Sequence, residues 1–444
     1  MQLHLQTISI ALPCKPFVLS GQETAGLDLH LYFDPSGELR CPECGRGAVV
    51  HAKSVSRRPL QAVAIAPYAR TFWHVANRRG RCLQCDFTFT EDIPFRFCGR
   101  HVTVDLARKV CEDMDAPNAN IRSTARRLGM GEDLARRVYD GYLRQALALE
   151  PEPADVRSVA VDEFSILKGH RYATLAIDLD HRRVLYTCLG RNEAAVAPFF
   201  SMYSKEFYDN IACVAMDQNH SYASHFSRHL PHVAIVSDRF HMSQNYTREV
   251  VDKVRLRIAR QYRRDGDHEG YLLFKRANYR LLGSPRRDPS RAADERELDG
   301  QLLLRRLMGM NGDINTVVLM FEQLRALYLL ADEARMRWQW LEWLSMAERS
   351  GIPELVDFAI RKHNFTDQVV AHASHQVTSA VIEGMMNKIK VIKRAAFGFR
   401  NFGHFFRRIR YTFLPDHIKQ LAKQTLWTNS SQALLGPLDH AKCG

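Results

Sequence analysis

The chain has 444 residues, 46% of them hydrophobic, and carries 62 Lys plus Arg against 49 Asp plus Glu, a formal net charge of +13. This length predicts roughly two to four domains with enough apolar residues for their cores. The positive charge favours a phosphate-rich partner over an acidic or neutral one. No run of about 18 apolar residues and no basic leader is present, so we expect a soluble, cytoplasmic protein.

The first segment, residues 1–97, contains two Cys-x-x-Cys pairs, formed by Cys41, Cys44, Cys82 and Cys85. Ten cysteines in a chain of this length are too few for a disulfide scaffold. A two-residue gap lets a tight turn direct both thiolates at one ion, and four thiolates complete a tetrahedral structural zinc site. The strand-like sequence AVAIAPYARTFWHVANRRGR between the pairs could form a hairpin. We therefore predict a zinc-ribbon region, with a redox pair or ordinary buried thiols as the alternatives.

Residues 98–150 show apolar positions every three to four residues, which predicts helices. Gly129-Met130-Gly131 interrupts this pattern as a short turn, so the segment is a helix-turn-helix candidate. Its second helix should begin near Glu132 and present Arg136 and Arg137 to a DNA groove or to phosphates. A small helical bundle with a solvated arginine face is the alternative.

Strand patterns begin after the Glu150-Pro151-Glu152-Pro153 linker and extend over residues 155–242. The runs RSVAVDEF, YATLAIDLD and RRVLYTCLG predict three antiparallel strands. A helix (EAAVAPFFSMY), a strand (IACVAMD), a second helix (SYASHFSRHL) and a last strand (HVAIVSD) follow. The predicted order is βββαβαβ. Asp162 is expected at the end of the first strand and Asp217 at the end of the fourth, where a parallel pairing would bring both carboxylates to one edge.

Residues 243–374 change to long, charged helical periodicity without a convincing strand, which predicts an all-α insertion. The sequence GSPRRDPSRAADER within it is expected to be a polar loop. Trp338, Trp340 and Trp343 follow one another in RMRWQWLEWL, and we expect core positions for them rather than a platform for stacking bases.

The last segment, residues 375–444, sets Glu383 at the start of a basic helical run. Eight Lys or Arg and no Asp or Glu occur from Lys388 to Arg410, interleaved with phenylalanines. Helical spacing places Glu383, Asn387 and Lys390 on one face, away from Ile389 and Ile392. Five basic residues are candidate phosphate contacts: Lys388, Lys390, Lys393, Arg394 and Arg400. A solvated amphipathic helix with a surface glutamate is the alternative.

Asp162, Asp217 and Glu383 together would form a set of hard oxygen ligands suited to two Mg²⁺ or Mn²⁺ ions. Such a pair of ions activates an attacking oxygen and stabilises the leaving oxygen in phosphodiester displacement. Each aspartate alone could be an ordinary turn residue. Their topological order favours the metal site.

The sequences VDEFSILKGHRYATLAIDLD, DRFH and EGMMNKIKVIKRAAFGFRNF resemble bacterial insertion-sequence transposases of the ISL-three family. The resemblance covers nearly the whole chain and implies a catalytic domain of RNase H-like fold with an Asp, Asp, Glu triad at Asp162, Asp217 and Glu383. It also matches Asp238 and His241 to an Asp/Cys-x-x-His element that follows the second catalytic Asp in related transposases. Asp238 is a rival to Asp217 as the second ligand because it too ends a predicted strand, and Asp217 is preferred. Where relatives commonly have Leu-Asn-Asn, this chain has Met385-Met386-Asn387, so Asn387 either orients Glu383, touches DNA or is a surface amide.

The fold class expected is therefore multidomain α/β, with a zinc ribbon, a helix-turn-helix and an RNase H-like mixed sheet interrupted by an all-α insertion. The resemblance implies a nucleoid-associated DNA transposase that binds the terminal inverted repeats of its element and cleaves and joins strands with Mg²⁺ or Mn²⁺. Double-stranded DNA is the expected partner, zinc the structural ion, and at least a dimer the active form. The alternatives are a catalytically silent zinc-containing regulator and a structure-specific nuclease.

Overall fold

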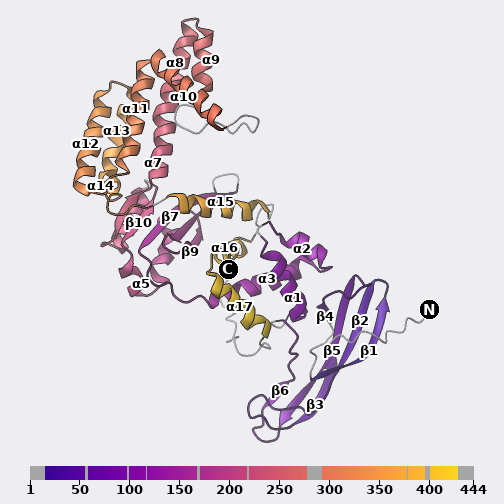
Figure 1. Cartoon of the computed structure of the whole chain (residues 1–444). Coiled ribbons are helices and arrows are strands. Elements are labelled where there is room, and N and C mark those ends of the chain that lie inside the picture. The colour runs from indigo at the N-terminus through magenta and orange to yellow at the C-terminus, as the bar shows by residue number, and fades with distance from the viewer. Residues whose placement is uncertain are drawn as a thin grey trace. The chain divides into compact units, whose positions relative to one another are not determined.

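The computed structural model describes residues 16–55, 59–97, 100–116, 118–167, 171–217, 220–277, 293–377, 379–395 and 401–428. The chain divides into two compact units (Figure 1). Unit 1 combines Met1–Pro151 with Lys388–Gly444, and unit 2 is Glu152–Asn387. None of the helices within the described ranges is long and apolar enough to cross a lipid bilayer.

Unit 1 begins with a six-stranded sheet in which the long strand β5 is the centre. Its strands are β1 Phe17–Ala25, β2 Asp28–Pro35, β3 Ala48–Val55, β4 Leu60–Ala62, β5 Arg70–Cys82 and β6 Thr88–Thr90. β5 pairs in parallel with β2 and antiparallel with β3, β4 and β6. Alternate residues of β2 are buried, as expected of a strand with one face on a core. Phe33, Trp73 and Phe95 pack against one another in that core.

The helices of unit 1 come from both ends of the chain and share one core. They are α1 Val104–Met114, α2 Ile121–Arg127, α3 Glu132–Ala148, α16 Phe402–Thr412 and α17 Asp416–Thr428. Thr103 and Asn120 cap the starts of α1 and α2 by accepting backbone N–H groups. Tyr411 of α16 reaches the core of α1 to α3, where its hydroxyl lies 2.9 Å from the hydroxyl of Tyr142.

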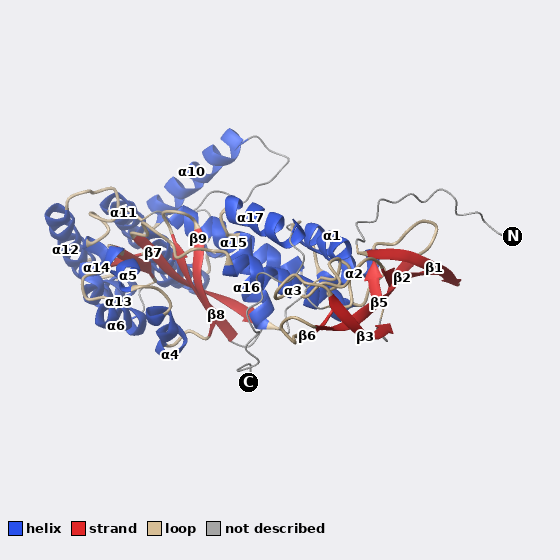
Figure 2. Ribbon diagram, turned by 90° about the horizontal axis from the view of Figure 1, so that it is seen from below, coloured by secondary structure: helices blue, strands red, loops and turns tan. Residues whose placement is uncertain are grey.

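Unit 2 contains a five-stranded mixed sheet in the order β11-β10-β7-β8-β9. Its strands are β7 Ser158–Leu167, β8 Arg171–Asp178, β9 Arg183–Leu189, β10 Cys213–Met216 and β11 Ala234–Ser237. β7, β8 and β9 form an antiparallel meander, and β10 pairs in parallel with both β7 and β11. The helices interspersed with these strands are α4 Glu193–Val196, α5 Lys205–Asn210 and α6 His220–His229. Figure 2 draws the strands of this sheet in red and the helices in blue.

The remainder of unit 2 is helical in its described ranges and has a core of its own. The helices are α7 Arg239–Tyr246, α8 Asp252–Arg264, α9 His268–Arg276, α10 Ala293–Met310, α11 Gly312–Leu327, α12 Glu333–Arg349, α13 Pro353–Lys362, α14 Thr366–Val370 and α15 Ser379–Ala395, the last of which continues into unit 1. A π-helical segment, Thr247–Val251, joins α7 to α8, and the short 3₁₀ segment His363–Phe365 joins α13 to α14.

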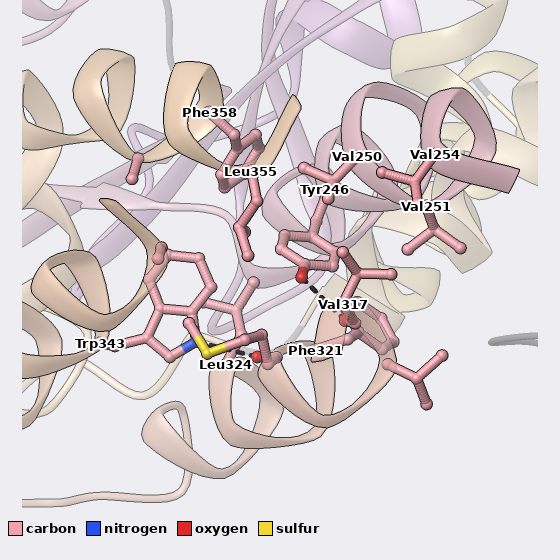
Figure 3. Close-up of a cluster of buried hydrophobic side chains, with 14 of the residues drawn as sticks. Tyr246, Val250, Val251, Val254, Val317, Phe321, Leu324, Trp343, Leu355 and Phe358 are labelled. Atoms are coloured by element: carbon pink, nitrogen blue, oxygen red, sulfur yellow. Dashed lines mark hydrogen bonds between the residues drawn. The ribbon is translucent and has the colours of Figure 1, made fainter. Parts of the chain in front are cut away.

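Aromatic side chains pack among aliphatic ones in this helical core (Figure 3). The hydroxyl of Tyr246 donates to the Val317 carbonyl at 2.8 Å, and the indole N–H of Trp343 donates to the Met320 carbonyl at 2.8 Å. Trp340 stacks on Trp343 with ring centroids 5.4 Å apart. The core positions predicted for these two tryptophans are confirmed, because both are at most 1% exposed.

Trp338, in contrast, is 66% exposed, so the prediction that all three tryptophans are core residues is wrong at this position. A helix turns by about 100° per residue, so Trp338 and Trp340 cannot share one face of α12.

The predicted order of strands and helices in residues 155–242 is largely confirmed. The single helix expected at EAAVAPFFSMY is wrong: α4 is four residues long and is followed by a 3₁₀ segment, Ala197–Ser201. Pro198 lacks the backbone N–H that a longer α-helix needs there. The polar loop expected at GSPRRDPSRAADER is partly wrong, because its last residues begin α10, while its first ten residues and the Lys168–His170 turn lie outside the described residues.

Candidate functional site

Three parallel strands of unit 2 reach the same level of the sheet, and at that level each has an acidic residue either within the strand or directly after it. Met216 of β10 is the partner of Val161 in β7 and of Ser237 in β11. The residues that directly follow these three are Asp162, Asp217 and Asp238. A common register therefore gathers three carboxylates on adjacent strands, with Asp217 on the middle one.

The sequence predicted Asp162 at the end of its strand. This prediction is wrong, because β7 continues to Leu167. Antiparallel pairing with the longer β8 holds this extension in place, whereas the parallel neighbour β10 ends at Met216. One Asp162 carboxylate oxygen accepts the backbone N–H of Glu163 at 2.7 Å. The Asp162 side chain is 16% exposed, so one edge of it still faces the surface.

His241 connects two of these carboxylates. Its Nε2 lies 3.7 Å from Asp162 Oδ1 and 3.8 Å from Asp238 Oδ2. The Asp162 carboxylate, with the charges of Asp217 and Asp238, raises the pKa of His241 to about 9. The imidazole is therefore cationic at neutral pH and offsets part of the negative charge.

Asp217 and Asp238 have different surroundings although their strands are neighbours. Asp217 is exposed, whereas the Asp238 side chain is 7% exposed and caps α7 by accepting the Phe240 N–H at 2.8 Å. Burial raises the pKa of Asp238, and the charges of Asp162 and Asp217 add to the effect. A carboxylate that caps a helix has already used an oxygen lone pair that a metal ion would need.

Two further charged residues feel the charge of these aspartates and were not identified from the sequence. Burial, together with the charges of Asp162 and Asp217, raises the pKa of Glu163. Lys362 at the end of α13 is 6% exposed; burial lowers its pKa, and the charges of Glu249 and Asp217 oppose that shift. Glu163 could have been suspected from its position next to Asp162, but no local pattern singles out Lys362.

Glu383 lies on the exposed face of α15, as do Asn387 and Lys390, while Ile389 and Ile392 are buried. The predicted helix faces are therefore confirmed. Glu383 belongs to the same unit as Asp162 and Asp217. Within the described ranges, however, the carboxylates and His241 do not bring three ligand atoms within 4.8 Å of one another.

The sequence profile of a transposase family, ISL3, matches residues 159–409, which include all of these side chains. The transposase of insertion sequence element IS1001 from Bordetella parapertussis is 32% identical over 393 residues, 88% of this chain and 93% of that protein. The chain belongs to the ISL3 (ISL-three) family of transposases. Transposases of IS1557 from two Mycobacterium tuberculosis strains are 26% identical over 272 residues, 56% of this chain and 58% of each relative.

The four cysteines of this ISL3-family chain converge in unit 1, where their sulfur atoms lie within 4.8 Å of one another. The separations are 3.6 Å for Cys41 to Cys85 and 3.4 Å for Cys44 to Cys82. Tetrahedral zinc with Zn–S bonds of about 2.3 Å places sulfurs roughly 3.8 Å apart. The residue that follows each pair, Gly45 or Asp86, has a positive φ, which closes the turn. The cluster is compatible with a zinc ion.

The helix-turn-helix candidate of the transposase has its turn where the sequence predicted it, since α2 ends at Arg127 and α3 begins at Glu132. Gly129 has φ +62°, and a Cβ there would lie 3.1 Å from the Ala69 carbonyl oxygen. Arg137 of α3 is exposed. Arg136 instead donates to Glu132 at 2.7 Å and to Asp133 at 2.8 Å, within its own helix.

The basic run of the transposase is divided between two helices rather than forming one. Lys388, Lys390 and Arg394 are exposed on α15, Lys393 is half-buried, and Arg400 lies outside the described residues. The arginines of α16 face inward: Arg407 pairs with Asp140, Arg410 pairs with Glu150, and Arg408 is buried. Only the α15 half of the run therefore offers exposed positive charge among the residues that can be placed.

Proposed function

We propose that this chain binds the terminal inverted repeats of its insertion sequence and cleaves and joins DNA strands at Asp162, Asp217 and Glu383. The observation that carries the proposal is the common register of β7 and β10, which sets Asp162 and Asp217 side by side. Membership of a transposase family gives the reaction class. The exposure of Asp217 supports its choice over Asp238 as the second ligand.

The strand order of unit 2 supports an RNase H-like catalytic domain. Numbered along the chain, its five strands lie in the order 3-2-1-4-5, with three antiparallel strands followed by two parallel ones. We assign residues 155–242 and 375–444 to the two parts of this domain. Residues 243–374, in which the described elements are helices, form the insertion between them.

Carboxylate oxygens are hard ligands, so Asp162, Asp217 and Glu383 suit Mg²⁺ or Mn²⁺. When bound, two such ions would activate the attacking oxygen and stabilise the leaving oxygen. Water first hydrolyses the phosphodiester at an element end and frees a 3′-hydroxyl. That hydroxyl then attacks a phosphodiester of target DNA, so each step breaks one P–O bond and forms another.

His241 and Asp238 have a positioning role in this proposal. The imidazolium of His241 lies near the Asp162 and Asp238 carboxylates and reduces their mutual repulsion. Asp238 in turn fixes the start of α7, the helix that carries His241. Asn387, one helical turn after Glu383 on the same exposed face, is placed to orient it or to contact DNA.

DNA binding is assigned to the four-cysteine region of residues 1–97, with Zn²⁺ as its structural ion, and to the helix-turn-helix of residues 98–150. Exposed basic residues on two helices supply phosphate contacts: Arg137 on α3 and Lys388, Lys390 and Arg394 on α15, with Lys393 beside them and Arg400 further along the chain. Binding should weaken on the order of 10³-fold between low and physiological salt if six or more phosphates are neutralised. Arg136 joins this set only if it leaves its two carboxylate partners.

Two element ends have to meet before strands can be joined, so we assign the activity to a dimer or a larger homo-oligomer on DNA. Gel filtration of the protein with DNA that carries one element end, and with DNA that carries both element ends, would test this assembly. A complex with one protein copy that still joins both ends would contradict it.

The test of the proposal is a Mg²⁺-dependent cleavage and strand-transfer assay on DNA that carries the element ends. Glu383→Gln removes the third charge, and Glu206→Gln, an exposed residue of α5, is the matched control. We expect joined products from wild type and Glu206→Gln and none from Glu383→Gln, with all three binding the ends equally. If wild type binds the ends but does not cut them, the protein is a regulator. If wild type cuts the DNA but does not join strands, it is a nuclease.

A further inference from the structure

A cavity of about 220 Å³ lies within unit 1, lined by parts of α1, α3, α15, α16 and α17. Three cationic side chains line it, Lys388, Arg408 and Lys419, against a single carboxylate, Asp115. Val391 and Ile392 supply part of its apolar wall. The cavity therefore has a net positive charge and a partly apolar lining.

Arg408 is the unusual member of this group, because its residue is only 3% exposed. One guanidinium NH₂ group donates to the Ala119 carbonyl at 2.8 Å. Within the described part of the chain no carboxylate lies within ion-pairing distance of Arg408, and burial lowers its pKa. A buried charge without an opposite charge is costly, and arginines are seldom buried unless they are paired.

The one carboxylate of the cavity is already engaged with other groups. Asp115 accepts the Tyr411 hydroxyl at 3.1 Å and pairs with Lys423 at 2.7 Å. Lys419 donates to the Thr412 carbonyl at 3.1 Å and pairs with the exposed Asp416 at 3.3 Å, which leaves one of its three ammonium protons available. Lys388 is exposed, and its Nζ lies 5.2 Å from the centre of the Phe413 ring.

We propose that this cavity binds a single phosphate group, with Arg408 at its base and Lys388 and Lys419 at its sides. Arginine and lysine are the side chains that bind phosphate most strongly, through charge-assisted hydrogen bonds. A volume of about 220 Å³ is below the range of about 300 Å³ upward that is usual for larger ligands. One small anion fits that size better than a whole nucleotide. The phosphate can be a DNA backbone phosphate, in which case the inference rests on the proposed function, or free inorganic phosphate.

The first experiment measures the thermal midpoint of the full-length protein against inorganic phosphate at constant ionic strength. Three variants accompany wild type: Lys388→Gln/Lys419→Gln, Arg408→Met, and the control Lys253→Gln/Lys275→Gln. Both control lysines are exposed and lie outside the cavity. A ligand that binds only the folded state raises its stability with the logarithm of ligand concentration.

We expect the midpoint of wild type and of the control to rise with phosphate, and that of both cavity variants to stay constant. Arg408→Met keeps a long side chain and removes the unpaired charge, so it should remain folded in phosphate-free buffer. An equal rise in all four proteins would refute the proposal, because phosphate would then act without the cavity. A wild-type midpoint that does not rise with phosphate would refute binding of free phosphate. The DNA experiment would then decide whether the cavity binds a DNA backbone phosphate.

The second experiment distinguishes the two sources of phosphate by measuring binding of a duplex of arbitrary sequence against salt. If the cavity holds a DNA phosphate, the slope of log K against log salt should be smaller by about 0.9 in Arg408→Met than in the control. Arg408 is buried and is not among the exposed phosphate contacts of the proposed function, so this variant reports on the cavity alone. If this slope is unchanged but the thermal midpoint of wild type rises with phosphate, the cavity binds the free anion. An unchanged slope with no midpoint rise in wild type overturns the proposal. Neither measurement depends on strand transfer, so each stands if the cleavage assay fails.

Discussion

Asp217→Asn and Asp238→Asn each remove one negative charge from neighbouring strands, and we predict different consequences for them. Asp217 is exposed, whereas Asp238 is buried and caps α7. If Asp217 is the second metal ligand, its amide variant should bind DNA normally but lose cleavage. Asp238→Asn should retain cleavage, because the asparagine oxygen can still accept the Phe240 N–H.

The magnitudes follow from these surroundings. Losing a metal ligand removes several kcal/mol of transition-state stabilisation, so cleavage by Asp217→Asn should fall on the order of 10³-fold. Asp238→Asn removes a buried charge that lies beside other carboxylates, and its thermal midpoint should equal or exceed that of wild type. Asp238→Ala loses the cap, which costs about 1 kcal/mol, or roughly 2–4 °C in a unit of this size.

The assay combines single-turnover cleavage of an end-labelled duplex at saturating protein with calorimetric midpoints of the same preparations. Saturation separates the chemical step from DNA affinity. Cleavage by Asp217→Asn at the wild-type rate, with loss of cleavage in a folded Asp238→Asn protein, would refute the assignment and make Asp238 the second ligand.

Three further predictions concern zinc, the helical core and pH. Cys41→Ser or a chelator should lower the thermal midpoint of the N-terminal region and release about one zinc ion per chain, and a metal analysis that finds no zinc in the purified protein would contradict this. Trp343→Ala should destabilise the protein by about 3–5 kcal/mol, whereas Trp338→Ala should stay within about 0.5 kcal/mol; equal losses in urea unfolding would contradict the burial difference. Burial lowers the pKa of His372 to about 4. As pH falls from about 6.5 to 4, His372 therefore becomes protonated in the unfolded chain but stays neutral in the folded chain. Stability should fall over that window, by on the order of 3 kcal/mol, and His372→Phe should flatten the fall; an unchanged pH profile in the variant would contradict this.

The neighbouring positions of Asp162 and Asp217 in the sheet of unit 2 could be anticipated from the sequence because they depend on local patterns. VAVDEF and CVAMDQ each place an aspartate after a short β-branched or apolar run, and the order of helices and strands made a parallel pairing between them the natural arrangement. The helix turn at Gly129 was likewise predictable, since glycine at that spacing interrupts helical periodicity.

Other features depend on contacts between distant parts of the chain, which local patterns do not reveal. Lys362 reaches the surroundings of Asp217 only because α13 packs in the helical part of unit 2. The length of β7 past Asp162 is set by its partner β8. The basic run looked like one exposed surface, yet Arg407 and Arg410 pair with Asp140 and Glu150, more than 250 residues earlier in the chain.

The shared core of unit 1 also has a consequence for synthesis on the ribosome. The hydroxyls of Tyr142 and Tyr411 are hydrogen-bonded across 269 residues, and Leu414, Ile418 and Ala422 belong to the same core as α1 to α3. The first three helices are therefore made early but lack part of their packing until the last helices leave the ribosomal tunnel. A chain terminated before Phe402 cannot complete this core, so translation has to reach the C-terminal helices before the N-terminal ones acquire their full stability.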